Sequence, residues 1–171
     1  MVIVVVDGYN IIGAWDELKQ LKEKDIGQAR DRLIELMAEY QSYSGYRVII
    51  VFDAYYVRGI ESKLQEFNVE IIYTKEKETA DECIEKLVKK LKNVKNQVYV
   101  ATSDYTEQRT IFAQGALRKS ARELFIELKD VERQIIENIE SHKQVKPQTK
   151  IELDESILNK FEKMRRGEFS D

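Results

Sequence analysis

The stretch VVVDGYN, residues 4–10, ends an apolar run with an acid, a glycine and two polar residues. The run Val2–Val6 is short, continuous and β-branched, which is typical of a strand buried on both faces. An aspartate at the tip of such a strand either begins a turn or forms one corner of a functional site. The residues at the ends of the other predicted strands help to decide between these two interpretations.

Three later segments repeat the apolar pattern, at Val48–Phe52, Val69–Tyr73 and Val98–Ala101. Stretches with helical spacing of apolar residues separate them. Capping signals predict helix starts at Asp25, Ser62, Thr79, Asp104 and Ser120. Strands that are apolar throughout and alternate with helices indicate a parallel sheet covered on both faces. We therefore predict a three-layer α/β/α domain around a central parallel sheet of at least four strands.

The predicted domain covers residues 1–141, because the apolar stripe of its last helix is expected to face inward as far as Ile139. Residues 142–171 are predicted to form a polar connection, marked by Pro147, and a C-terminal amphipathic helix. The apolar stripe of that helix contains Ile157, Leu158, Phe161 and Met164. A stable monomer rarely leaves such a stripe in water, so the helix docks on the domain, pairs with another chain or binds a partner. Of these we expect docking on the domain, because the short polar connection with Pro147 allows the chain to fold back.

The composition is that of a soluble globular protein, with 171 residues, 43% of them hydrophobic and 35% charged. The first apolar run is too short for a signal peptide or a membrane span. The only cysteine is Cys83, which excludes an internal disulfide. We therefore expect a cytoplasmic protein that does not associate with a membrane.

The distribution of charge is more informative than the net charge of −3, which lacks the basic excess common in nucleic-acid-binding domains. The segment Gln108–Arg122 contains no acid. Its basic residues are Arg109, Arg118, Lys119 and Arg122. This segment is a candidate surface for RNA, whereas the lysine-rich stretch at residues 86–95 is interpreted as a solvated helix face.

Acids follow three of the four predicted strands, as Asp7, Asp53 and Asp104, and Asp81 lies in the first turn of the helix after the remaining strand. Parallel strands end at one edge of the sheet, which is where ligands bind in such folds. Each acid alone is also explained by a turn or a helix cap. Four acids together are harder to explain in this way, since two carboxylates ~5 Å apart repel by roughly 3 kcal/mol at an effective dielectric constant of ~20.

A divalent cation would remove this repulsion, and a set of ligands that are all oxygen favours Mg²⁺ or Mn²⁺. The lone histidine, His142, follows the last predicted helix of the domain, so no Cys/His set competes for another metal. A carboxylate-bound Mg²⁺ activates water and stabilises charge during phosphoester cleavage. The chain has neither a phosphate-binding P-loop nor a Gly-x-Ser-x-Gly elbow.

Four motifs resemble the acidic motifs of NYN-domain ribonucleases, a branch of the PIN-like nuclease superfamily, and most closely those of the bacterial YacP-like group. They are DGYN at 7–10, VFDA at 51–54, ETADE at 78–82 and ATSD at 101–104. The resemblance covers about residues 1–141. Four motifs in the same order are more specific than any one of them.

The resemblance implies a PIN-like fold and an RNA endonuclease that depends on Mg²⁺ or Mn²⁺. It implies that the metal-binding, catalytic acids are Asp7, Asp53, Asp81 and Asp104, with Asn10 supporting the first of them. Glu82 is a further polar neighbour of the acids and a second candidate for a supporting role. Similar proteins are linked to ribosome-dependent cleavage of messenger RNA, so the ribosome is an expected partner. Which of the four acids is dispensable and how many metal ions bind remain open.

Aromatic and basic residues near the acids are candidates for RNA contacts. Tyrosines close to a strand end can stack on unpaired bases, and arginines can hold phosphates. The candidates are Tyr9, Tyr55, Tyr56, Arg58, Tyr105 and Arg109, together with Arg118, Lys119 and Arg122 of the basic segment. We expect at least one of these tyrosines to pack beneath the sheet edge instead.

Two other functions are compatible with acids at strand ends. A phosphatase or a phospho-accepting receiver domain needs an aspartate nucleophile, and the receiver also needs a lysine after a late strand. No such lysine follows the strand that ends at Ser103 and Asp104. The other alternative is a catalytically silent RNA- or ribosome-binding module on a nuclease fold. The sequence leaves open the RNA target, its sequence preference and the oligomeric state.

Overall fold

The computed structural model describes residues 1–54, 68–104, 109, 111, 113–144 and 155–167. The predicted helix at Ser62 lies outside these residues, as does most of the one predicted after Asp104. The chain separates into two compact units, Met1–Arg133 and Gln134–Asp171, and each is described by itself.

The first unit is built on a parallel sheet, as predicted, and the described residues contribute five strands to it. The strands are β1 (Val2–Asp7), β2 (Arg47–Phe52), β3 (Glu70–Tyr73), β4 (Gln97–Ala101) and β5 (Leu117–Lys119). Their order across the sheet is β3-β2-β1-β4-β5. In the centre, Val5 of β1 pairs with Ile49 of β2 on one side and with Val100 of β4 on the other. The strand β5 was not predicted, because its three residues form no apolar run.

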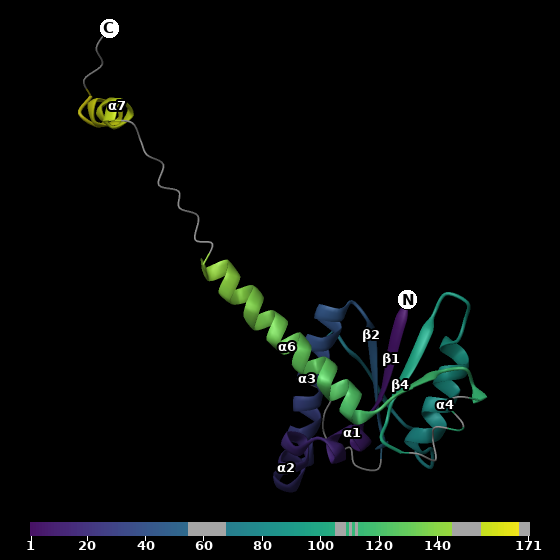
Figure 1. Ribbon diagram of the computed structural model, residues 1–171. Helices are drawn as coiled ribbons and strands as arrows, with labels where there is room; N and C mark the ends of the chain where they lie inside the picture. The colour runs from purple at the N-terminus through teal and green to yellow at the C-terminus, as the bar shows by residue number, and fades with distance from the viewer. Residues whose placement is uncertain (55–67, 105–108, 110, 112, 145–154, 168–171) are drawn as a thin grey trace. The chain divides into compact units, whose positions relative to one another are not determined.

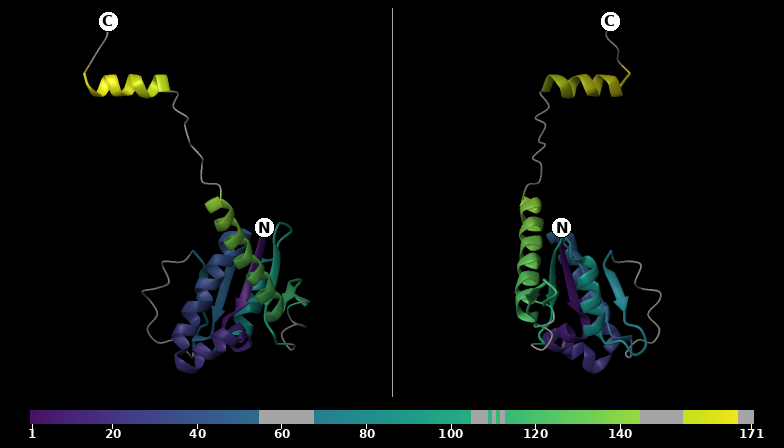
Figure 2. Two further views of the ribbon diagram at one scale, coloured as in Figure 1. Left: turned by 60° about the vertical axis from the view of Figure 1, so that its left-hand side comes forward. Right: turned by 90° about the vertical axis from the view of Figure 1, so that its right-hand side faces the viewer.

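Helices cover both faces of this sheet (Figures 1 and 2), which confirms the three-layer arrangement. On one face, Ile3 and Val5 pack in a common core with Ile84 and Val88 of α4 (Ala80–Leu91). The alternate residues of β1 point to the opposite face, because side chains alternate along a strand. That second core includes buried side chains of α3 (Ile26–Ser44) and of the first half of α6 (Ala121–Gln144).

The signals at the ends of the helices match the structure. The side chain of Asp25 accepts a hydrogen bond from the amide of Gly27 at the start of α3, and Gly45 ends that helix in the left-handed conformation. Thr79 and Glu82 form the predicted capping box of α4. The last turns of α6 differ from the prediction, because Ile139 is 50% exposed and the buried stripe includes only residues up to Val131.

Two short helices that the sequence pattern did not predict follow β1, namely α1 (Gly8–Ala14) and α2 (Asp16–Lys24). Helix α1 begins directly after the last residue of the strand. A side chain at Gly8 would lie 2.3 Å from the Phe52 ring, so only glycine allows this close approach. The abrupt turn from strand to helix places Asp7 at the point where β1 ends.

The second unit contains the end of α6 and the helix α7 (Glu155–Arg165). The side chains in the apolar stripe of α7 are exposed, namely Ile157, Leu158, Phe161 and Met164. Docking of α7 on the first unit stays a prediction, as does the boundary at residue 141. None of the helices in the described part of the chain is both long and apolar enough to cross a membrane.

Candidate active site

The four acids singled out from the sequence lie at the same edge of the sheet. Asp7 is the last residue of β1, Asp53 follows β2, and Asp104 lies three residues beyond β4. Asp81 is in the first turn of α4. All strands of the sheet are parallel, so their carboxyl ends, and the residues that follow them, come together.

The electrostatics of Asp7 show how closely these acids interact. The side chain is buried, with 6% of its surface exposed. Burial and the negative charges of Asp81, Asp104 and Asp53 raise the pKa of Asp7 from 3.8 to about 7, although a backbone hydrogen bond from Asn10 opposes the shift. Burial and the charges of Asp104 and Glu82 also raise the pKa of Asp81. Asp7 is therefore the centre of a cluster of mutually repelling carboxylates.

Asn10 holds one side of this cluster in place. Its Oδ1 accepts hydrogen bonds from the backbone amide of Ser103 at 2.7 Å and from the Ser103 hydroxyl at 2.8 Å. The Oγ1 of Thr102, which is fully buried, accepts a bond from the amide of Asp104 at 3.2 Å. These contacts tie α1 to the segment after β4 and so position Asp104 relative to Asp7.

The other predicted supporting residue, Glu82, caps the start of α4. Its Oε2 accepts a bond from the amide of Thr79 at 3.3 Å, and the Thr79 hydroxyl accepts one from the amide of Glu82 at 3.2 Å. The capping box fixes the first turn of the helix, which carries Asp81. Glu82 thus acts on the cluster by orienting this turn and by its negative charge.

The donor set fits a hard divalent cation, since it consists of carboxylate oxygens around one buried acid. Within the described residues, no three acid, histidine or cysteine side chains are already close enough to bind one ion together. Mg²⁺ commonly keeps several waters and binds directly to only one or two carboxylates. Acids that lie at one edge of the sheet without converging on one point are compatible with that mode of binding.

Tyr9 packs beneath the sheet edge, as expected for at least one of the tyrosines. Its ring lies 5.2 Å from that of Phe52, and its hydroxyl accepts a hydrogen bond from Nη1 of Arg30 at 2.8 Å. Phe52 in turn stacks on Tyr73, with ring centroids 5.9 Å apart. These contacts make Tyr9 part of the support beneath Asp7.

The buried Arg30 was missed in the sequence, although a signal was present. It is 3% exposed and lies in the first turns of α3. It shares the helical spacing of the inward stripe, being three and four residues before Leu33 and Ile34, which are both buried. A basic residue at an apolar position of a helix indicates a buried polar contact, here the one to Tyr9.

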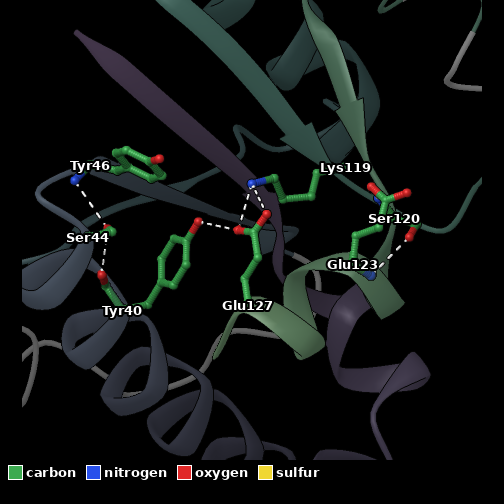
Figure 3. Close-up of polar contacts among 7 residues, drawn as sticks. All are labelled: Tyr40, Ser44, Tyr46, Lys119, Ser120, Glu123 and Glu127. Atoms are coloured by element: carbon green, nitrogen blue, oxygen red, sulfur yellow. Dashed lines mark hydrogen bonds and ion pairs between the residues drawn. The ribbon is translucent and has the colours of Figure 1, made fainter. Parts of the chain in front are cut away.

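Lys119 does not belong to an exposed basic surface, which corrects our grouping of it with the arginines. Its Nζ lies 2.7 Å from each carboxylate oxygen of Glu127 and 4.8 Å from the centre of the Tyr99 ring. Tyr40 donates a hydrogen bond of 2.6 Å to the same carboxylate (Figure 3). Lys119 is 7% exposed, so it fastens β5 to α3 and α6 instead of facing solvent.

The remaining basic candidates are accessible to different degrees. Arg109 and Arg122 are exposed, and Arg118 is half-buried. The candidates Tyr55, Tyr56, Arg58 and Tyr105 lie outside the described residues.

Two hollows are lined by residues that follow the strands of the sheet. One, of about 580 Å³, is lined by Asp53, Ala54 and residues 75–79. The other, of about 880 Å³, is lined by Trp15 and Ser103, by Arg118 of β5, and by Arg122 and Phe125 of α6. We call the second hollow the Trp15 groove.

A family model of the YacP-like NYN domain matches residues 4–166. The chain belongs to this family. The order of its acidic motifs, the parallel sheet and the grouping of the acids at one edge agree with a nuclease-type NYN fold.

Relatives of this YacP-like protein are similar over nearly the whole chain. YacP of Bacillus subtilis (strain 168) is 57% identical over 168 residues, which are 98% of this chain and 99% of that protein. The crystal structure of Rae1 (YacP) from Bacillus subtilis matches with a TM-score of 0.78 at 57% identity, and covers 98% of this chain and 96% of the other. A mutant of the same protein matches with a TM-score of 0.75 at 53% identity and the same coverage.

Proposed function

We propose that this protein is a divalent-metal-dependent endoribonuclease that cleaves phosphodiester bonds of RNA. The observation that carries the proposal is the buried Asp7, whose pKa is raised by burial and by three further carboxylates. A protein that only binds RNA has no need for four acids that repel both one another and the phosphates. Membership of the NYN family supports the same conclusion.

In this proposal the acids Asp7, Asp53, Asp81 and Asp104 hold Mg²⁺ or Mn²⁺. The bound cation would supply a more acidic water and stabilise the charge that builds up at the phosphate. Asn10 keeps Asp104 in position through Ser103, and the capping box of α4 does the same for Asp81. The chain itself therefore contributes ligands, their orientation and a partly buried site.

We further propose that the substrate is messenger RNA, cleaved in the cytoplasm in association with the ribosome. The family resemblance of the acidic motifs supports this choice. The exposed Arg109 and Arg122 provide positive charge for an RNA backbone or a ribosomal surface. The whole chain carries a net charge of only −3, which agrees with RNA binding that is confined to one region.

The test compares the wild-type protein with Asp81→Asn and with Glu39→Gln, which neutralises an exposed acid of α3. Cleavage of a defined messenger RNA is followed with Mg²⁺, with Mn²⁺ and with EDTA, each with and without ribosomes. We expect wild-type and Glu39→Gln to cleave only with metal, and Asp81→Asn to be inactive with an unchanged circular dichroism spectrum. RNA or ribosome binding without cleavage under any of these conditions would instead identify a silent binding module.

A further inference from the structure

The Trp15 groove begins where the acid cluster ends. Ser103, which lines the groove, is bonded to Asn10 and immediately precedes Asp104. On the far side, the groove is bounded by Arg118 of β5 and by the first turns of α6. A group bound in the groove would therefore lie beside the site at which the acids act.

The charges that line the groove are not equivalent. Asp16, in the first turn of α2, lines the groove as an acid, and the carboxylate of Glu17 is paired with Arg32 at 2.9 Å. Glu123 is used in a capping box with Ser120, with bonds of 3.2 and 3.0 Å (Figure 3). The guanidinium of Arg122 is exposed, and that of Arg118 lies in the wall. The exposed guanidinium of Arg122 suits a phosphate, which arginine can bind through two parallel hydrogen bonds.

An aromatic surface lies in the same groove. The Trp15 indole is 5% exposed and is held rigidly, because its Nε1 donates a hydrogen bond of 2.9 Å to the carbonyl of Ala121. The ring of Phe125 packs edge-on against it at 5.5 Å and remains 38% exposed. Lys129 places its ammonium 5.3 Å from the centre of the Phe125 ring. An exposed ring supported from behind is a suitable platform for a base.

We propose that the Trp15 groove binds one unpaired nucleotide next to the phosphate that is cut. The base stacks on Phe125, where it displaces the exposed end of Lys129, and Arg122 holds the adjoining phosphate. This inference rests on the proposed function and extends it to the form of the substrate. A base can reach Phe125 only after it leaves its stack, so the groove selects single-stranded over duplex RNA.

The chain provides its own reporter for this binding, because Trp15 is its only tryptophan. The full chain is prepared as Asp81→Asn, which changes no residue of the groove and, according to the proposed function, does not cut the RNA. Tryptophan emission is followed in Mg²⁺ while an unpaired eight-nucleotide RNA, or the same RNA annealed to its complement, is added. We expect a saturable change with the single strand and a much weaker response with the duplex.

Groove variants and matched controls are then compared in that background. Arg122→Gln and Phe125→Leu should each raise the Kd about tenfold, equivalent to about 1.4 kcal/mol. The controls Arg133→Gln and Ile126→Ala remove an exposed charge and an exposed apolar side chain of the same helix, outside the groove, and should change the Kd less than twofold. In the chain with Asp81 intact, the two groove variants should raise the KM for a short RNA more than they lower kcat.

The outcomes separate this inference from the proposed function. If RNA is bound and cut but groove and control variants behave alike, or Trp15 emission does not respond, the groove is not the nucleotide site and the nuclease assignment stands. Equal affinity for duplex and single strand would also overturn the inference. If the full chain neither binds nor cuts RNA, both proposals are wrong.

Discussion

The raised pKa of Asp7 predicts how the stability of the metal-free protein depends on pH. Between pH 3.8 and about 7, the folded protein holds a proton on Asp7 that the unfolded chain has released. Folding is therefore favoured less and less as the pH rises through this window, and the loss is complete above pH 7. Asp7→Asn keeps the size of the side chain but does not titrate, so the variant should lack this loss.

The size of the effect follows from the two pKa values, at 1.36 kcal/mol for each pH unit over which only one state is protonated. Relative to fully protonated Asp7, ionisation destabilises the folded wild type by about 4 kcal/mol at pH 8 and by about 1.5 kcal/mol at pH 5. Between these two pH values the variant should thus gain about 2.5 kcal/mol relative to the wild type. With an m value of roughly 2 kcal/mol/M in urea, this is a relative shift of roughly 1 M in the midpoint.

The assay is urea unfolding in EDTA at pH 5 and pH 8, followed by far-ultraviolet circular dichroism. Glu39→Gln serves as the control, because it removes an exposed carboxylate outside the cluster. Adding Mn²⁺ at pH 8 should stabilise the wild type more than Asp7→Asn, since the folded wild type has the more complete site for the ion. If Asp7→Asn and the wild type lose stability in parallel from pH 5 to pH 8 in EDTA, the pKa of Asp7 is not raised by its burial and by the neighbouring carboxylates.

Three further predictions concern the packing of the sheet and helices and the C-terminal segment. Glu127→Ala should lower the free energy of unfolding by about 1 to 3 kcal/mol in urea titrations, because it leaves the buried ammonium of Lys119 unpaired; Glu132→Ala on the same helix is the control. Gly8→Ala should cost about 1 to 3 kcal/mol by the same measurement, through overlap with the Phe52 ring. Truncation after Ser141 should leave a cooperatively folding protein with a somewhat lower melting temperature, and failure to fold would show that the C-terminal segment belongs to the core.

The parallel sheet could be predicted because its central strands are continuous apolar runs, each ended by a polar residue. The position of the acids followed directly, since parallel strands bring Asp7, Asp53 and Asp104 to one edge whatever the details of the helices. Asp81 was located by its capping box, which depends only on local sequence. These features could be predicted because the local sequence pattern alone favours the structure that the folded protein adopts.

The features that were missed depend on partners distant in the sequence. Strand β5 exists because Leu117 and its two successors pair with β4, not because of their own composition. Lys119 is neutralised by Glu127, eight residues later and on another element. The Trp15 groove combines residues of α1, β5 and α6, which no spacing along the chain relates to one another.

The central claim, that the four acids bind the metal that cleaves RNA, is tested most directly by a crystal structure of the full chain soaked with Mn²⁺. Anomalous scattering then locates the ion independently of any assumed ligand. We predict an ion coordinated directly by at least one of Asp7 and Asp81, with the other acids bonded to it or to its waters. A fully occupied Mn²⁺ at another position, or no ion at the acids at concentrations that support cleavage of RNA, would contradict the account.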